Sequence, residues 1–237
     1  MYGLAVLLAL GAAAVYLAFN YIDVIVKVGL EHYGPEVTGA SVKVGEVRIS
    51  PSTGRGAIRG LEIGSPAGFT APRAARFGEI RVALDPSTLT SRVILIHELT
   101  LEAPRIIYEK GARGANLDAI QERIDAYVKK SGGGSSADGS GGTSLRRRFI
   151  IERLTLRGGH VTMTNSALKG QGLGFDLPEI ELRDVGKRQN GLTASEAAGV
   201  VASALQNKIA QKVLTNIDLL RKGGIEGAVD ALRGLLK

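Results

Sequence analysis

One short motif recurs along the chain and restricts the folds that the chain can adopt. It consists of an apolar residue, two others, an apolar residue, one other and a third apolar residue. Copies are found at Val44/Val47/Ile49, Ile58/Leu61/Ile63, Phe77/Ile80/Val82, Ile96/Leu99/Leu101, Ile151/Leu154/Leu156 and Leu177/Ile180/Leu182. One face of a regular strand follows a period of two, so the three-residue step requires a β-bulge or a break. If neighbouring strands bulge at matching places, the sheet curves and its apolar face becomes concave.

Two copies of the motif are especially alike. They are Ile96-His97-Glu98-Leu99-Thr100-Leu101 and Ile151-Glu152-Arg153-Leu154-Thr155-Leu156. We expect bulges within these copies, at His97-Glu98 and Glu152-Arg153, and a further bulge at Gly45-Glu46. Val44, Ile96 and Ile151 would then lie side by side on one face of the sheet.

The first nineteen residues form an apolar stretch that predicts a membrane anchor. No residue before Asp23 carries a charge, and the run from Tyr2 to Phe19 is almost wholly apolar. About 20 such residues cross the hydrocarbon core of a bilayer. A cleaved signal peptide is the alternative, but no Lys or Arg precedes the run, and the small residues 12–14 lie inside it. The predicted anchor residues are Leu4, Leu7, Leu8, Leu10, Val15 and Leu17.

The periodicity of the sequence divides the remainder of the chain. Helical spacing from Tyr21 to Tyr33 predicts a juxtamembrane helix that ends at Gly34-Pro35. Strand-like alternation follows in two parts, Ser41 to Glu109 and Phe149 to Arg183. Asn116 can cap a helix that ends at Lys130, and residues 131–144 contain only Ser, Gly, Ala, Asp and Thr, as a flexible linker would.

The C-terminal region has the pattern of amphipathic helices. Thr193 and Glu196 have the spacing of a capping box, and a second short helix is predicted around residues 225–236. We expect these helices to cover the sheet, although a membrane or a partner protein could also take their apolar faces. The predicted segments are an anchor and helix (1–33), a first β-rich part with its terminal helix (34–130), a linker (131–144), a second β-rich part (145–190) and C-terminal helices (191–237).

These patterns together predict the α+β class. An N-terminal transmembrane helix would precede a curved, groove-like and mostly antiparallel sheet, followed by a helical C-terminus. The two β-rich parts are expected to build one sheet with a shared core.

Composition and motifs exclude several kinds of chemistry. The chain has no cysteine, so thiolate metal sites and cysteine nucleophiles are excluded. The histidines His32, His97 and His160 lie on different segments without a catalytic motif, so we predict neither an enzyme nor a cofactor. His97 adjoins Glu98, but it aligns with Glu152 in the other copy, as a polar strand position would. A metal is not predicted either.

The net charge of +7 admits more than one kind of partner. Aromatic residues make up 5% of the chain and its basic residues are scattered, which argues against nucleic acid. Anionic lipid headgroups and a merely solvated basic surface both remain open.

An ordered series of short motifs resembles a known family. The series comprises Thr38-Gly39-x-x-Val42-x-Val44, Gly60-Leu61-x-Ile63, Ser65-Pro66-x-Gly68-Phe69, Leu84-Asp85-Pro86-Ser87-x-Leu89, Ile94-x-Ile96, Ala103-Pro104-x-Ile106 and Asn116-Leu117. Over roughly residues 1–185 it resembles the AsmA-like proteins of Gram-negative bacteria. The resemblance implies a single-pass inner-membrane protein with most of its chain in the periplasm. Larger relatives build a long curved sheet with an apolar groove that is thought to carry phospholipid between the membranes.

Two hypotheses on function follow from the resemblance and the expected sheet. In the first, the groove binds lipid acyl chains, with a phospholipid as the expected lipid, for lipid transport or outer-membrane homeostasis. Because this chain is much shorter than the bridging relatives, we expect lipid handling near the inner membrane. In the second, the chain is a non-catalytic scaffold that docks on another envelope protein through its C-terminal helices. The candidate groove residues are Val44, Val47, Ile63, Val82, Ile96, Leu99, Ile151 and Leu154.

Overall fold

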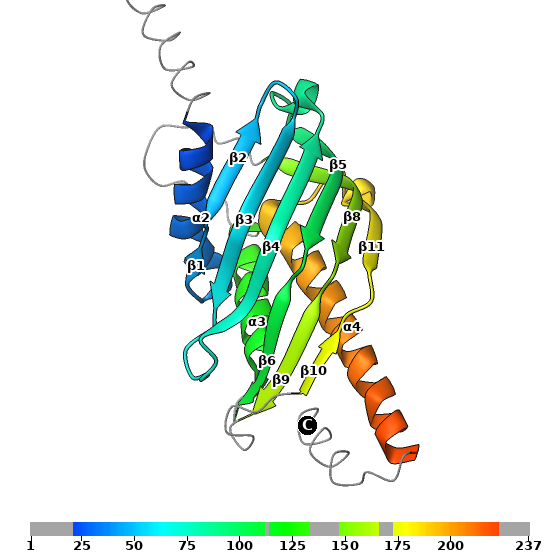
Figure 1. The fold of residues 1–237 in the computed structure, drawn as a ribbon. Coiled ribbons are helices and arrows are strands. Elements are labelled where there is room, and N and C mark those ends of the chain that lie inside the picture. The colour runs from blue at the N-terminus through cyan, green and yellow to red at the C-terminus, as the bar shows by residue number, and fades with distance from the viewer. Residues whose placement is uncertain (1–20, 112–113, 133–146, 166–172, 223–237) are drawn as a thin grey trace, which may run out of the picture.

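The strands of both β-rich parts join in one eleven-stranded sheet. The computed structural model describes residues 21–111, 114–132, 147–165 and 173–222, and it has the predicted α+β class (Figure 1). Its strands are β1 (Val42–Lys43), β2 (Glu46–Ser50), β3 (Arg55–Gly64), β4 (Arg73–Leu84), β5 (Val93–Glu102), β6 (Arg105–Gly111), β7 (Gly114–Ala115), β8 (Arg148–Arg157), β9 (His160–Asn165), β10 (Leu173–Asp176) and β11 (Ile180–Val185). Its helices are α2 (Ile22–Thr38), α3 (Asn116–Gly132) and α4 (Ala194–Lys222), with the 3₁₀ turns η1 (Pro86–Thr88) and η3 (Lys187–Gln189).

The two similar copies of the motif become neighbouring strands. β5 pairs with β8 in parallel, so that Ile96 lies opposite Ile151 and Leu99 opposite Leu154. β6 pairs with β9 in the same way, while the other strand pairs are antiparallel. The sheet is therefore mostly antiparallel, as predicted, but mixed. Parallel neighbours need a crossover between them, and here the crossover includes α3.

A first line of bulges crosses the sheet inside these copies. The register between β4 and β5 shifts at Ala83/Leu84, opposite His97. His97 and Glu152 are skipped in the β5–β8 register, and Asp184 of β11 has a φ of 53°. The predicted bulge at His97-Glu98 is confirmed by the shift against β4, whereas at Glu152-Arg153 the pairing skips Glu152 without changing register. Ile151, Leu154 and Leu156 are all buried, as the three-residue step requires.

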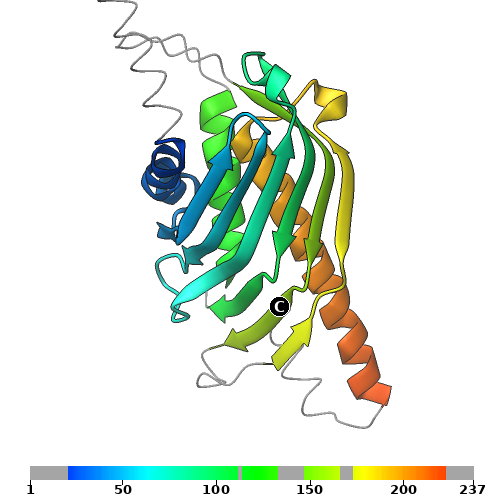
Figure 2. The ribbon, with the colours of Figure 1, turned by 45° about the horizontal axis from the view of Figure 1, so that its top comes forward.

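A second line of irregularities crosses the sheet, while β3 and β4 run through it as single strands. It separates β1 from β2 at Gly45, β5 from β6 at Ala103, and β8 from β9 at Gly158. The backbone is left-handed at Ala103 (φ 47°) and Gly158 (φ 64°), and the Ala103 N–H donates a hydrogen bond to the Arg157 carbonyl at 2.9 Å. Figure 2 shows the sheet bending where β5, β8 and β11 give way to β6, β9 and β10. The interruption at Gly45, where a bulge was predicted, and the break at Ala103 therefore belong to one line.

Two helices cover one face of the sheet, which we call the inner face (Figures 1 and 2). Ile120 and Ile124 of α3 and Leu205 and Ile209 of α4 join the strand residues in one core. The helix predicted from Asn116 to Lys130 is present and runs two residues further. The capping box is confirmed as well. The Glu196 N–H donates to Thr193 Oγ1 at 3.2 Å, and the Thr193 N–H donates to Glu196 Oε2 at 2.7 Å.

The prediction that Gly34-Pro35 ends the juxtamembrane helix is wrong. α2 continues to Thr38 and ends at Gly39, which has a φ of 68° and whose N–H donates to the Pro35 carbonyl. Packing against the edge strand explains the difference. A Cβ on Gly34 would lie only 2.7 Å from a methyl carbon of Val42, so the glycine allows the helix to approach β1 closely.

Among the helices that the structure describes, none has both the length and the apolar character needed to cross a membrane. The predicted anchor at residues 2–19 lies outside the described residues. Most of the predicted linker and the predicted helix at residues 225–236 also lie outside them.

Candidate functional site on the inner face

Three rows of aliphatic side chains run across the inner face, because paired residues of neighbouring strands point to the same side. The first row is Val47, Ile58, Ile80, Leu101, Leu156 and Ile180. The second is Ile49, Gly56, Val82, Leu99, Leu154 and Leu182. Beyond the first line of bulges, the third is Leu84, Ile96, Ile151 and Val185.

Burial along these rows is uneven. On β8, Ile151, Leu154 and Leu156 are no more than 2% exposed, since α3 and α4 and their neighbours cover them. Between β2 and β5 most members of these rows are only partly buried, although Val47 and Leu101 of the first row are buried. We call the partly buried aliphatic residues of these rows on β2 to β5 the open strip, and it consists of Ile49, Ile58, Ile80, Val82, Leu84, Ile96 and Leu99. An apolar surface that is uncharged and incompletely covered is the kind of surface that takes an apolar ligand.

The predicted groove residues divide among three places. Val82, Ile96 and Leu99 lie together in the open strip. Ile151 and Leu154 pair with Ile96 and Leu99 in the same rows, but they are fully buried in the core.

The other three predicted residues lie on the side of the sheet that is formed by β1, β2 and β3. Val44 and Val47 are buried beside α2, and Ile63 pairs with Val42 beyond the second line of irregularities. The expectation that Val44 lies beside Ile96 and Ile151 is wrong, because β3 and β4 intervene.

Sequence reasoning omitted four members of the open strip. Ile49, Ile58 and Ile80 already belong to copies of the motif, so the pattern itself could have identified them. Leu84 does not belong to any copy. It reaches the strip because the register shift at Ala83/Leu84 places it opposite Ile96, and that shift depends on the pairing of β4 with β5.

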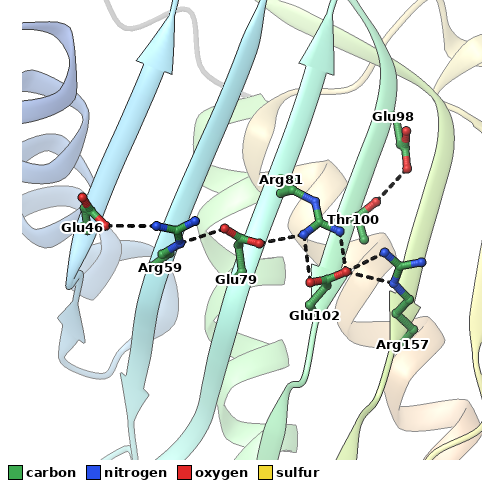
Figure 3. Close-up of polar contacts among 8 residues, drawn as sticks. All are labelled: Glu46, Arg59, Glu79, Arg81, Glu98, Thr100, Glu102 and Arg157. Atoms are coloured by element: carbon green, nitrogen blue, oxygen red, sulfur yellow. Dashed lines mark hydrogen bonds and ion pairs between the residues drawn. The ribbon is translucent and has the colours of Figure 1, made fainter.

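The opposite, outer face carries charges instead of apolar rows. Figure 3 shows a ladder of alternating charge, which consists of Glu46, Arg59, Glu79, Arg81, Glu102 and Arg157. Arg59 Nε lies 2.8 Å from Glu79 Oε1, and Arg157 lies 2.5 Å from Glu102. Hydrogen bonds from Arg81 and then Arg157 hold the pKa of the Glu102 carboxyl below its ordinary value. Lipid chains therefore have no apolar surface to contact along this ladder.

A shallow hollow of about 760 Å³ lies on the outer face beside the ladder. Ala57, Ala83 and Thr100 form part of its lining, with Arg48 and Glu98 among them. Arg48 is paired with Glu46, and the Glu98 carboxylate accepts a hydrogen bond from Thr100. Arg55 and Arg81 also line the hollow, as do Ile49 and Val82 of the open strip, so its surface mixes charged and apolar groups.

Two histidines pair with carboxylates at well-exposed positions. His97 Nδ1 lies 2.9 Å from Glu152 Oε2 at the first line of bulges, and His160 Nδ1 lies 2.8 Å from Asp176 Oδ1. Each pair consists of two residues on neighbouring strands. The described residues contain no group of three or more potential metal ligands.

Comparisons with known proteins do not assign the site. A scan against protein-family models finds no match to this chain, and a search of curated proteins finds no matching relative. The functional proposal therefore rests on the geometry of the sheet and on the sequence.

Proposed function

We propose that this protein is a membrane-anchored lipid-binding protein whose open strip binds the acyl chain of a phospholipid. The observation that carries the proposal is the half-burial of Val82, Ile96 and Leu99, next to fully buried partners in the same rows. Apolar surface gains roughly 25 cal/mol per Å² when it is removed from water, so an alkyl chain on the strip would be stabilised.

The shape and chemistry of the strip suit an alkyl chain. It crosses four strands from β2 to β5, which is about 14 Å at the usual strand spacing. Its side chains are aliphatic, with no charge or hydrogen-bonding group to orient a polar ligand. A long, narrow and apolar surface of this kind matches a flexible hydrocarbon chain better than a compact polar metabolite.

Anchorage in a membrane is the second part of the proposal. It rests on the uncharged run from Tyr2 to Phe19 and on the position of α2 directly after this run. The resemblance to AsmA-like proteins supports the bacterial inner membrane, with the sheet in the periplasm. In that location the protein would serve lipid transport or envelope homeostasis without catalysing a reaction.

Photocrosslinking tests the proposal with controls on the same strands. Val82 pairs with Leu99 and the neighbouring Ala83 pairs with Glu98, so the alternation of strand side chains places the two pairs on opposite faces of the sheet. A photoreactive amino acid at position 82 or 99 of the full chain should give lipid adducts in cells, and one at position 83 or 98 should not. If a folded protein gives only protein adducts at both inner positions, the open strip is not a lipid site.

A scaffold role is the second candidate. It is favoured by the end of α4, which projects beyond β10 in Figure 1 and could reach another envelope protein. Mass spectrometry of lipids that co-purify with the full chain separates the two candidates. Phospholipid in stoichiometric amount, lost when Val82 and Leu99 are changed to Asp, supports lipid binding. Its absence from the gently extracted protein supports the scaffold.

A further inference from the structure

Three charged side chains of α2 reach back to the protein, whereas Glu36 near its end is exposed to solvent. Asp23, Lys27 and Glu31 recur every four residues and lie along the open edge of β1 and β2. Asp23 Oδ1 accepts a hydrogen bond from the Ile49 N–H at 2.7 Å, and Glu31 Oε1 accepts one from the Val44 N–H at 2.8 Å. Lys27 Nζ donates to the carbonyl of Gly45 at 3.1 Å. α2 thus closes a sheet edge whose backbone groups would otherwise lack partners.

The side of α2 that is turned to solvent is apolar along its first turns. We call it the α2 stripe, and it consists of Tyr21, Val24, Ile25 and Val28, which are 53% to 57% exposed. Their spacing of three and four residues places them on one face. A helix at a water-exposed surface ordinarily has the reverse arrangement, with apolar residues toward the protein and charges toward water.

The end of the sheet beside the start of α2 is basic. The β2–β3 turn, η1, the start of β8 and η3 meet at this end, because Leu84 N–H bonds to Gly54 and Arg148 N–H bonds to Arg92. Figure 1 shows the same end, with the first turn of α2 beside it. The basic residues here are Arg55, Arg92, Arg147, Arg148, Lys187 and Arg188, next to the acidic Asp85 and Asp184. We call this group of basic residues the basic end.

We propose that the α2 stripe and the basic end together form a surface that rests on an anionic lipid bilayer. The inference rests on the membrane anchorage proposed above. The apolar run ends at Phe19, two residues before the stripe begins at Tyr21. Val28 lies only about 10 Å further along the helix axis, within the thickness of a bilayer interface. Tyrosine, aliphatic residues and nearby cations are the residues that such an interface favours.

The surface also gives the open strip a defined position. Ile49 lies at the β2 end of the strip, and its backbone N–H donates a hydrogen bond to Asp23 of α2. The strip therefore begins next to the element that enters the interface, so that an acyl chain reaches it from the bilayer without crossing the charged outer face.

Site-specific quenching tests the surface in the full chain. The chain contains no cysteine, so single Cys substitutions can carry a bimane fluorophore. The labelled positions are Val28→Cys in the stripe and Arg188→Cys at the basic end, with Glu36→Cys on the last turn of α2 and Glu179→Cys between β10 and β11 as exposed controls. The liposomes contain phosphatidylcholine, phosphatidylglycerol and a lipid with a nitroxide on its headgroup.

Several-fold stronger quenching at positions 28 and 188 than at 36 and 179 is expected. Replacing phosphatidylglycerol with phosphatidylcholine should reduce quenching at 188 more than at 28, because only the basic end depends on lipid charge. Equal quenching at all four positions, in a chain that floats with the liposomes, would overturn the proposed surface but would leave the proposed membrane anchorage in place. A chain that does not float overturns both. A pyrene label at position 28 that forms excimers without nitroxide quenching would instead indicate a second copy on the stripe.

Discussion

Glu109 shows how one buried charge holds a loop in place. Its side chain is 3% exposed, and its carboxylate accepts hydrogen bonds from the Thr70 N–H, the Thr70 hydroxyl and the Ala71 N–H at 2.6 to 2.9 Å. These bonds connect the loop that contains Ser65-Pro66-Ala67-Gly68-Phe69 to β6. Burial alone would raise the pKa of this carboxyl, but the hydrogen bonds outweigh it and the pKa is lowered.

Replacing Glu109 with Ala should therefore reduce the free energy of unfolding by about 2–3 kcal/mol at neutral pH, since three donors lose a charged acceptor. The folded pKa is depressed, so this contribution is present above the unfolded pKa and is lost as the pH falls through the folded pKa. Urea unfolding of both proteins at pH 7 and pH 3 measures it, with the exposed Glu36→Ala as a control. A difference that stays constant between these pH values would contradict the assignment.

At the scale of the element, α2 covers the edge of the sheet at β1 and β2 and supplies hydrogen-bond acceptors to its backbone N–H groups. Asp23→Ala and Glu31→Ala should each cost about 1–2 kcal/mol, because the amides of Ile49 and Val44 lose their acceptors. Hydrogen exchange should accelerate at these two amides and remain unchanged at Leu154 in the core. Lys27→Ala should have a smaller effect, since the Gly45 carbonyl is exposed and water can replace the ammonium group. Unchanged exchange at both edge amides would show that α2 does not protect the edge.

At the scale of the whole molecule, the two β-rich parts depend on each other. β5 pairs with β8 and β6 with β9, and the core includes residues from both parts. A protease site inserted between Gly139 and Ser140 should therefore be cleavable without separating the fragments. Size-exclusion chromatography in detergent should show them together until denaturant is added. Separation of the fragments without denaturant would mean that two independent domains are present.

The sequence by itself determined the local features of this protein. The three-residue step of Ile151, Leu154 and Leu156 predicted a bulged strand with one apolar face, and Thr193 and Glu196 predicted the start of α4. Both signals are local, because a bulge and a capping box depend on residues that are a few positions apart. The class of the fold and the joining of two parts into one sheet were predictable from the same patterns.

Only the tertiary structure decided which apolar residues are covered. Ile96 and Ile151 occupy equivalent positions in nearly identical copies, yet Ile151 is dry and Ile96 is half-buried because of where α3 and α4 lie. Packing against Val42 likewise allows α2 to continue past Gly34-Pro35. The hydrogen bond between Asp23 and the Ile49 N–H also depends on where α2 lies beside the edge of β2. These outcomes depend on contacts between segments far apart in the chain, for which no pattern within one segment can specify the partner.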